Sequence, residues 1–182
     1  MLRAILDHPE GVLVGVRTPE ASFREIATAD GRIRLHYSEL GDRLRAINPT
    51  DEAEWLRLPD EFPLILMAGR HMDANSNTNM RDPGWNEGRR ACTLAMSPAD
   101  AERLGFTDGQ MVRVVTAAGA EAIELEVTSD ARSGQVIIPH GFGLIHNGVA
   151  YGVNVNRLTK NTHRDFVGTP MHRYVPCRVE AV

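Results

Sequence analysis

The stretch FPLILMAGR at positions 62–70 decides the fold, because a continuous apolar run ends there in Gly69 and Arg70. An apolar run this short, closed by glycine, is typical of a strand buried on both faces. A polar stretch rich in Asn, Asp, Gly and Pro follows as far as Gly88. Long loops inside compact domains are usually functional or disordered. The sequence therefore predicts a buried strand that leads directly into a functional loop.

Further short elements follow this loop at close spacing. Ser97 is a suitable N-cap, Pro98 suits the first helical turn, and Gly105 ends a helix of about two turns. Short strands with one brief helix indicate a small, mainly β barrel rather than a parallel sheet with long crossovers. The segment 140–161 holds four glycines and four asparagines, and is expected to be irregular backbone near a ligand. The predicted strands are 62–69, 91–96, 110–116, 120–128 and 135–139.

The first 61 residues are expected to form an irregular α/β lead-in of separate pieces. Alternation over 31–36 predicts a strand, and the segments 38–47 and 50–58 predict helices, the first capped by Ser38. These pieces hold too few apolar residues for a core of their own. We therefore predict two parts, a lead-in over 1–61 that packs on the barrel or on an absent partner domain, and a barrel over 62–182.

Charge is distributed unevenly between these parts. The net charge is −4, with 8 basic and 12 acidic residues through Glu61 and 12 of each afterwards. Such a balance argues against general nucleic-acid binding, which needs a basic surplus. No apolar run approaches the roughly 20 residues that span a bilayer. The start of the chain lacks the features of a signal peptide, so the expected location is cytoplasmic.

Known catalytic and metal-binding patterns are missing from the sequence. Cys92 and Cys177 form no CxxC pair, and the seven histidines show no HxH, HxxxH or HExxH spacing. There is no nucleophile elbow, Walker loop or dinucleotide fingerprint followed by a helix. We therefore expect neither a catalytic residue nor a protein-ligated metal ion.

Three segments have the composition of a binding site: the loop after Gly69, the Pro139-His140-Gly141 corner, and GVNVNRLT at 152–159. Asparagine offers both donors and acceptors, as the edge of a pterin or guanine ring requires. Arg70 and backbone amides that follow a glycine suit a diphosphate. Each segment alone is equally compatible with ordinary turns, which Asn and Gly also favour.

The order of the segments is more specific than any one of them. FPLILMAGR, a loop with NSNT, MSPADAERLGFTDGQMVRVVTAAGA, SGQVIIPHGFG and GVNVNRLT follow one another. In this order they resemble the C-terminal dinucleotide-binding domain of the molybdopterin oxidoreductases, the dimethyl sulfoxide reductase family. The resemblance covers about 62–182, and LDHPEG with DGRIRL looks like the segment that leads into this domain.

The resemblance implies a double-psi β-barrel that binds molybdopterin guanine dinucleotide carrying molybdenum or tungsten. In such enzymes the loop after the Gly-Arg pair wraps the cofactor, the residue after the proline of a later strand contacts it, and the Asn of the NxLT block binds a pterin. A basic residue near the chain end also contacts the cofactor. The cofactor-binding residues implied here are Gly69, Arg70, His71, Met72, Asn75, Asn77, Thr78, His140, Asn154, Asn156 and Arg173.

The function implied by the resemblance is that of one part of a larger enzyme. The chain would bind and orient the cofactor as the C-terminal domain or small subunit of a molybdenum or tungsten oxidoreductase. The iron–sulfur cysteines and the metal ligand would lie in upstream catalytic domains or a large subunit, so the chain would not be a complete enzyme. Two alternatives remain at this point: a non-enzymatic double-psi barrel that binds a protein or peptide, and a self-contained hydrolase-like enzyme. The first leaves the Asn-rich loops unexplained, and the second needs a catalytic set that is not found.

Overall fold

The computed structural model describes residues 2–8, 10–69, 77–159, 164 and 168–182. The chain divides into two compact units, Met1–Trp55 and Leu56–Val182, and each is described by itself. The domain limits predicted from the sequence, 1–61 and 62–182, differ slightly from these units and stay a prediction.

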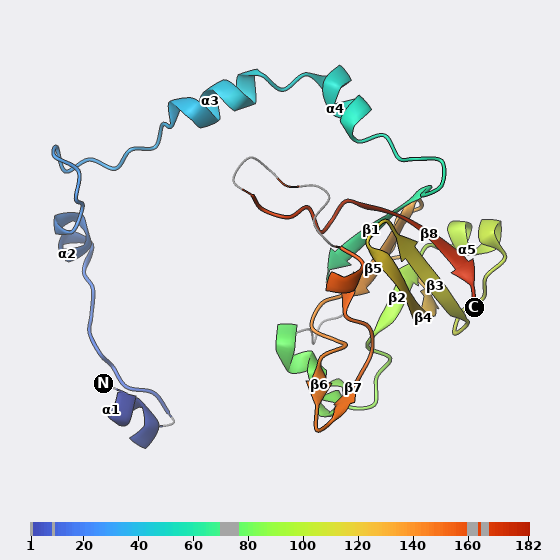
Figure 1. Ribbon diagram of the computed structural model, residues 1–182. Coiled ribbons are helices and arrows are strands. Elements are labelled where there is room, and N and C mark those ends of the chain that lie inside the picture. Colours follow the sequence, from blue (N-terminus) through green and yellow to red (C-terminus); the bar gives the residue numbers. More distant parts are fainter. Residues whose placement is uncertain (1, 9, 70–76, 160–163, 165–167) are drawn as a thin grey trace. The chain divides into compact units, whose positions relative to one another are not determined.

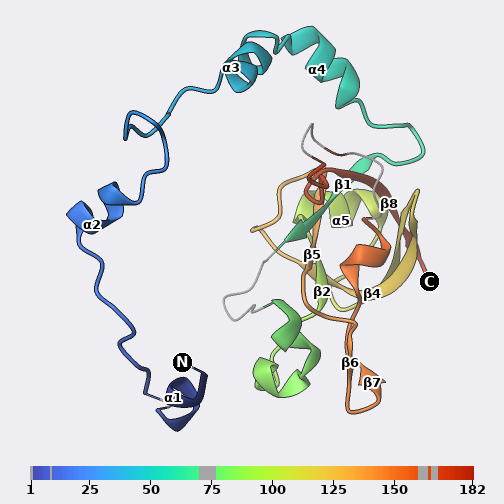
Figure 2. The ribbon, with the colours of Figure 1, turned by 60° about the vertical axis from the view of Figure 1, so that its left-hand side comes forward.

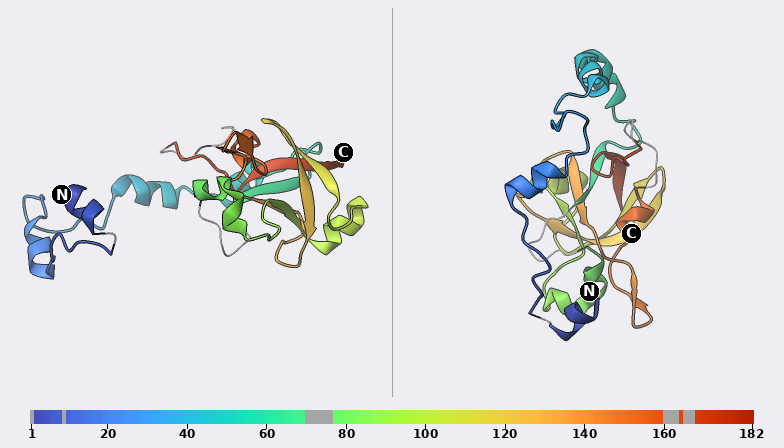
Figure 3. Two further views of the ribbon diagram at one scale, coloured as in Figure 1. Left: turned by 90° about the horizontal axis from the view of Figure 1, so that it is seen from below. Right: turned by 90° about the vertical axis from the view of Figure 1, so that its left-hand side faces the viewer.

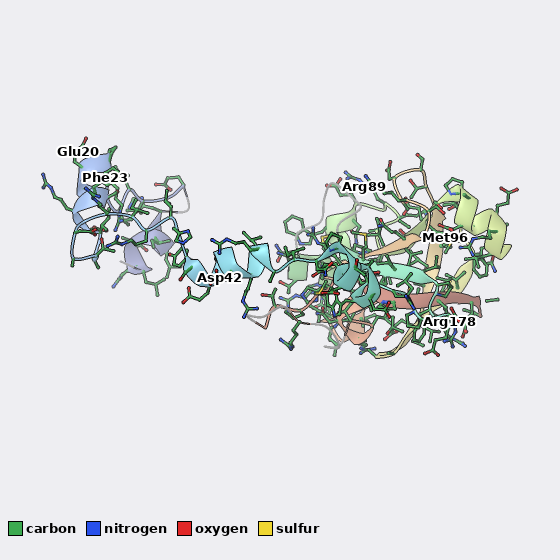
Figure 4. All side chains as sticks on the ribbon, turned by 90° about the horizontal axis from the view of Figure 1, so that it is seen from above. Glu20, Phe23, Asp42, Arg89, Met96 and Arg178 are labelled. Carbon is green, nitrogen blue, oxygen red and sulfur yellow. The ribbon has the colours of Figure 1, made fainter. Side chains whose placement is uncertain are left out.

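The first unit consists of short helices joined by extended segments. Thr18 caps the second helix by accepting a hydrogen bond from the amide of Ala21 at 3.2 Å, and Glu20 and Phe23 project from that helix (Figure 4). The helix predicted at 38–47 is present, but Tyr37 occupies its N-cap position without a side-chain hydrogen bond. The predicted cap at Ser38 is therefore wrong. The helices are α1 (Leu2–Asp7), α2 (Pro19–Arg24), α3 (Ser38–Arg45) and α4 (Pro49–Trp55).

The strand predicted at 31–36 is not formed. An extended segment becomes a strand only when its backbone groups pair with a neighbour, and none pairs with this one in the described part of the chain. Over 2–8 and 10–55 no residue is buried, and apolar side chains such as Leu13 and Leu35 are 81% and 90% exposed. The described residues of the first unit therefore form no hydrophobic core.

The second unit is a closed six-stranded barrel, which confirms the predicted mainly β class (Figure 1, Figure 2). Around the barrel the strands follow the order β1-β5-β2-β4-β3-β8. The barrel strands are β1 (Leu64–Gly69), β2 (Thr93–Met96), β3 (Met111–Thr116), β4 (Gly119–Val127), β5 (Gln135–Pro139) and β8 (Val175–Ala181). The remaining elements are α5 (Pro98–Leu104), a two-stranded hairpin of β6 (Ile145–His146) and β7 (Val149–Ala150), and the 3₁₀ turns η1 (Asn77–Arg81), η2 (Pro83–Asn86) and η3 (Val155–Arg157).

Alternate residues of β1 fill the barrel. Leu64, Leu66 and Ala68 of β1 are buried, whereas Ile65 and Met67 between them face outward and are half-buried. Successive side chains of a strand point to opposite faces, so this alternation divides the core from the outer surface. Met96, labelled in Figure 4, is completely buried in the same core.

The helix α5 begins at a buried polar network that also holds the start of β5. Ser97 caps the helix as predicted, because its hydroxyl accepts the amide of Asp100 at 3.2 Å, and Gly105 ends it in the left-handed conformation. The Asp100 carboxylate is 2% exposed and accepts the amide of Gly134 at 2.7 Å. Burial raises the pKa of Asp100, but hydrogen bonds from Arg103, Gly134 and the serine hydroxyls outweigh it, so the pKa lies below its usual value.

Two features of the barrel were not predicted. The strand β8, which contains Pro176, lies between β1 and β3 and closes the barrel. Proline inside a strand is typical of edge strands, and this one is not at an edge. The second feature is parallel pairing of β1 with β5 and of β2 with β4. The β1–β5 register places Gly69 opposite Pro139, so both strands end at the same place.

The hairpin β6–β7 extends from the barrel beside the η1–η2 segment (Figure 2, Figure 3). His146 of β6 lies 3.8 Å from the carboxylate of Asp82, which caps η2 through the amide of Gly84. This contact joins two segments that are far apart in the sequence, and both begin near the end of a barrel strand.

Candidate functional site

The candidate site begins where the parallel strands β1 and β5 end together. The amide of His140 donates to the carbonyl of Gly69 at 3.0 Å, so the segments that leave the two strands start from one hydrogen bond. In sheets with parallel strands, ligands bind outside the carboxyl ends of those strands. This end of the barrel is therefore the place where a ligand is expected.

A cavity of about 500 Å³ lies at this point. Met67 and Ile137 are register partners on the outer face of β1 and β5, and they give the cavity an apolar wall. Arg173, which precedes β8 and is exposed, contributes a guanidinium group. The lining residues are Met67, Gly69, Asn77, Ile137, His140 and Arg173.

A second cavity of about 270 Å³ shares Asn77 and His140 with the first. Its walls bring together side-chain amides and a hydroxyl from two separate segments, 77–78 and 154–156, which can both donate and accept hydrogen bonds. Together the two cavities lie within the usual size range of small-molecule sites, roughly 300–1,000 Å³. The second cavity is lined by Asn77, Thr78, His140, Gly141, Phe142, Leu144, Asn154, Asn156 and His172.

Glycine is required at two positions of the corner that follows β5. Gly141 has φ +97°, and a Cβ added there would lie 1.7 Å from the carbonyl oxygen of Asn77. Gly143 has φ +69°, and its added Cβ would lie 2.2 Å from the amide nitrogen of Asn154. Only a residue without a side chain allows such close approach. The glycines of the predicted corner therefore bring the Asn77 and Asn154 segments together around the cavity.

Hydrogen bonds to Thr116 and Cys92 anchor the 152–159 segment. The hydroxyl of Thr116 on β3 donates to the carbonyl of Leu158 at 2.8 Å, and the amide of Val153 donates to the sulfur of Cys92 at 3.2 Å. The Oδ1 of Asn154 accepts the amide of Asn156 at 3.1 Å. Asn154 thus serves partly as the turn-forming residue that its type suggests, while the side chain of Asn156 is exposed at the cavity.

Both cysteines are structural rather than reactive. Burial raises the pKa of the Cys92 thiol to about 11. Burial raises the pKa of the Cys177 thiol on β8 to about 12. The thiolate is the nucleophile and the metal ligand, and its population at neutral pH is negligible at these pKa values. The described residues contain no group of three or more His, Cys, Asp or Glu that could hold a metal ion.

The charges around the two cavities suit an anion. Among the described lining residues none carries a carboxylate, whereas Arg173 is cationic and His140 and His172 carry imidazole rings. A pocket lined by one sign of charge raises the local concentration of ligands of the opposite sign. The cavities therefore combine a cation, several amides and an apolar wall, as a phosphate-bearing heteroaromatic ligand requires.

Seven of the eleven residues implied by the resemblance fall within the described chain, and all seven line these cavities. Whether they contact a cofactor stays a prediction. The seven are Gly69, Asn77, Thr78, His140, Asn154, Asn156 and Arg173. The other four, Arg70, His71, Met72 and Asn75, lie outside the described residues.

The sequence assigned no role to His172, yet this residue lines the second cavity. Its ring meets that of His140 edge to face, with ring centroids 6.0 Å apart. The only signal in the sequence that could have indicated His172 as a lining residue is its position next to Arg173. Met67 and Ile137 were also missed as lining residues, because only the parallel register brings their outward faces together.

Comparison with known proteins gives a family match and several relatives. Residues 64–176 match the model of the molydopterin dinucleotide binding domain. A tetrathionate reductase subunit of Salmonella typhimurium is 24% identical over 147 residues, which cover 67% of this chain and 14% of that protein. Acetylene hydratase of Syntrophotalea acetylenica is 29% identical over 123 residues, covering 64% of this chain and 17% of that protein.

Solved structures extend the likeness over nearly the whole chain. Acetylene hydratase from Pelobacter acetylenicus matches with a TM-score of 0.57 and 23% identity, covering 96% of this chain and 25% of that one. This chain therefore spans a quarter or less of the length of these relatives. In the described part of the chain, no helix is both long and apolar enough to cross a membrane.

Proposed function

Because this chain belongs to the molydopterin dinucleotide binding domain family, we propose that its two adjoining cavities hold and orient a molybdopterin guanine dinucleotide. One observation carries the proposal: every described residue that the sequence implied as a cofactor contact lines these cavities. These residues come from separate segments: the end of β1, η1, the turn after β5, the η3 region and the turn before β8. An adaptor for proteins or peptides would not need such a convergence.

The chemistry of the lining fits the two ends of such a ligand. Asn77, Asn154 and Asn156 offer the donors and acceptors that the edge of a pterin or guanine ring needs. Arg173, with no carboxylate among the described lining residues, suits the diphosphate. The bound cofactor supplies the redox chemistry at its metal, and this chain supplies binding and orientation.

We also propose that the chain works as the C-terminal domain or small subunit of a larger molybdenum or tungsten oxidoreductase. Its relatives are several times longer, and the described residues offer no set of ligands for a metal ion. The exposed apolar side chains of the first unit would then be covered by the catalytic domains or by the barrel. A double-psi barrel, supported by the two parallel strand pairs, and a cytoplasmic location are part of the same proposal.

The test uses the assembled enzyme, meaning this chain together with the catalytic domains with which it purifies. We expect Arg173→Ala to speed release of the pterin about tenfold and Asn156→Ala a few-fold, as loss of a charge-assisted and a neutral hydrogen bond predicts. The readouts are metal content, pterin fluorescence after oxidation, and the nucleotide freed by acid hydrolysis.

The matched control is Arg132→Ala, since Arg132 is exposed in the turn before β5 and lines neither cavity. Pterin content and release that stay at the wild-type level in both site variants would refute the assignment of the site. Release of a nucleotide other than a guanine nucleotide would refute the guanine form alone.

A further inference from the structure

His172 lies at the site, although no sequence motif gives it a role. Its carbonyl accepts the amide of Ala68 on β1 at 2.8 Å, which fixes its backbone to the barrel. Its ring lies at 86° to that of His140, in an edge-to-face contact. The backbone of His172 is therefore held by β1, and its ring packs against that of His140.

His172 borders two cavities. It lines the second cavity of the site, and it also lines a neighbouring cavity of about 400 Å³ formed with Met171, Arg173 and Tyr174. Among the described residues, Nδ1 of His172 is buried and has no hydrogen-bond partner. Because Nδ1 is buried, Nε2 is the nitrogen left to a ligand in the second cavity.

This difference between the nitrogens determines the tautomer. A neutral imidazole carries its proton on one nitrogen and accepts with the other. A proton on Nδ1 would leave a buried N–H without an acceptor, and orphaned buried N–H groups are rarer than under-satisfied acceptors. In the neutral ring, the proton therefore favours Nε2.

We propose that His172 is a further ligand-binding residue of this site, which donates its Nε2–H to an oxygen acceptor of the cofactor. The inference rests on the proposed function, since it names an additional contact to the same ligand. The second cavity already offers amides that both donate and accept, and His172 adds a donor of fixed position. Its edge contact with His140 also keeps the two rings at a fixed angle.

The first test needs no cofactor. The full chain, labelled with ¹⁵N at histidine, is examined by long-range ¹H–¹⁵N NMR, and His172 is assigned by its absence in His172→Gln. We expect the pattern in which Nε2, and not Nδ1, carries the proton of the neutral ring. A pattern with Nδ1 protonated, or one averaged between the two tautomers, would overturn the inference.

The second test separates hydrogen bonding from packing in the assembled enzyme. His172→Phe keeps a ring against His140 but removes the donor, whereas His172→Gln keeps a donor near the position of Nε2. We expect pterin release to rise a few-fold in the Phe variant, as in Asn156→Ala, and to return to the wild-type rate in the Gln variant. His146→Phe, on the β6 hairpin outside both cavities of the site, is the matched control.

Equal release from the Phe variant and wild type would overturn the inference, and so would equal losses in the Phe and Gln variants, since packing alone would then explain them. Failure of the inference is distinguishable from failure of the proposed function. If Arg173→Ala and Asn156→Ala speed release but His172→Phe does not, only the role of His172 is lost.

Discussion

At the scale of single residues, the site depends on positions where a side chain cannot be placed. Gly141 and Gly143 let the corner after β5 touch the Asn77 and Asn154 segments, which carry the amides of the second cavity. The polar residues of the site are therefore positioned by their glycine neighbours.

Replacement of Gly141 by alanine tests this directly. A left-handed φ alone costs about 1 kcal/mol for a residue with a side chain, but here the added Cβ would also meet the Asn77 carbonyl at 1.7 Å. We expect Gly141→Ala to lower the free energy of unfolding by more than about 2 kcal/mol, because local strain adds about 1–3 kcal/mol. Urea denaturation of the variant and of wild type measures this difference in unfolding free energy.

Gly109→Ala is the control for this substitution. Gly109 has φ +79° and no atom within 4 Å of an added Cβ, so only the backbone cost of about 1 kcal/mol should appear. Equal destabilisation by the two substitutions would contradict the close packing described for the corner.

The cysteines give a second prediction at this scale. Because burial raises the pKa values of Cys92 and Cys177 to about 11 and about 12, thiolate is scarce in the folded chain at pH 8. Iodoacetamide should therefore modify both thiols far more slowly in the native chain than in urea, as mass spectrometry would show. Rapid native modification of Cys177 would mean that β8 does not close the barrel.

At the scale of elements, helix α5 and strand β5 are linked through Asp100. The folded state lowers the pKa of this carboxyl below its unfolded value of about 3.9, so its ionised form stabilises the fold. That contribution is complete above the unfolded pKa and is lost as pH falls through the folded pKa. We expect Asp100→Asn to cost about 1–3 kcal/mol at pH 7.

The pH dependence of the unfolding free energy tests whether the charge of Asp100 stabilises the fold. The stability difference between wild type and Asp100→Asn, measured by urea unfolding, should be constant from pH 5 to 7 and shrink below about pH 4. A difference that does not depend on pH would mean that the charge of Asp100 does not contribute.

Among the helices and strands, some could be predicted from the sequence and others could not. The helix α5 and strand β5 were predicted because local signals specify them: Ser97 as a cap, Gly105 as an end, and an apolar run closed by Pro139. The parallel pairing of β1 with β5 was not predicted, since register depends on partners far away in the sequence. The strand β8 was not predicted, because Pro176 argued against a strand there. The segment 31–36 was predicted as a strand from its alternation, but it has no described neighbour with which to pair.

The site shows the same division between local and long-range information. His140 and Asn156 were implied because ordered blocks of sequence carry them. His172 was missed because its place depends on a hydrogen bond to Ala68 and on the ring of His140. A binding residue that owes its position to tertiary contacts leaves little local signal.

At the scale of the whole molecule, the two units differ in how they are stabilised. The main hydrophobic core consists entirely of residues between Leu64 and Val179, whereas the described residues of the first unit bury none of their side chains. The barrel should therefore fold without the first unit.

Deletion of residues 1–55 tests this expectation. The remaining chain keeps Leu56, whose carbonyl accepts the hydroxyl of Tyr174. We expect a single cooperative thermal transition within a few degrees of that of the full chain, because no buried core contact is removed. Loss of cooperative unfolding would show that the first unit contributes to the core.

The central claim is that the common end of β1 and β5 holds the cofactor. The most direct measurement is an experimental structure of the assembled enzyme with its cofactor bound. We predict pterin and nucleotide density in the two cavities, in contact with His140, Asn156 and Arg173. Cofactor density that contacts this chain only elsewhere, for instance at α5 or the β3–β4 hairpin, would contradict the claim.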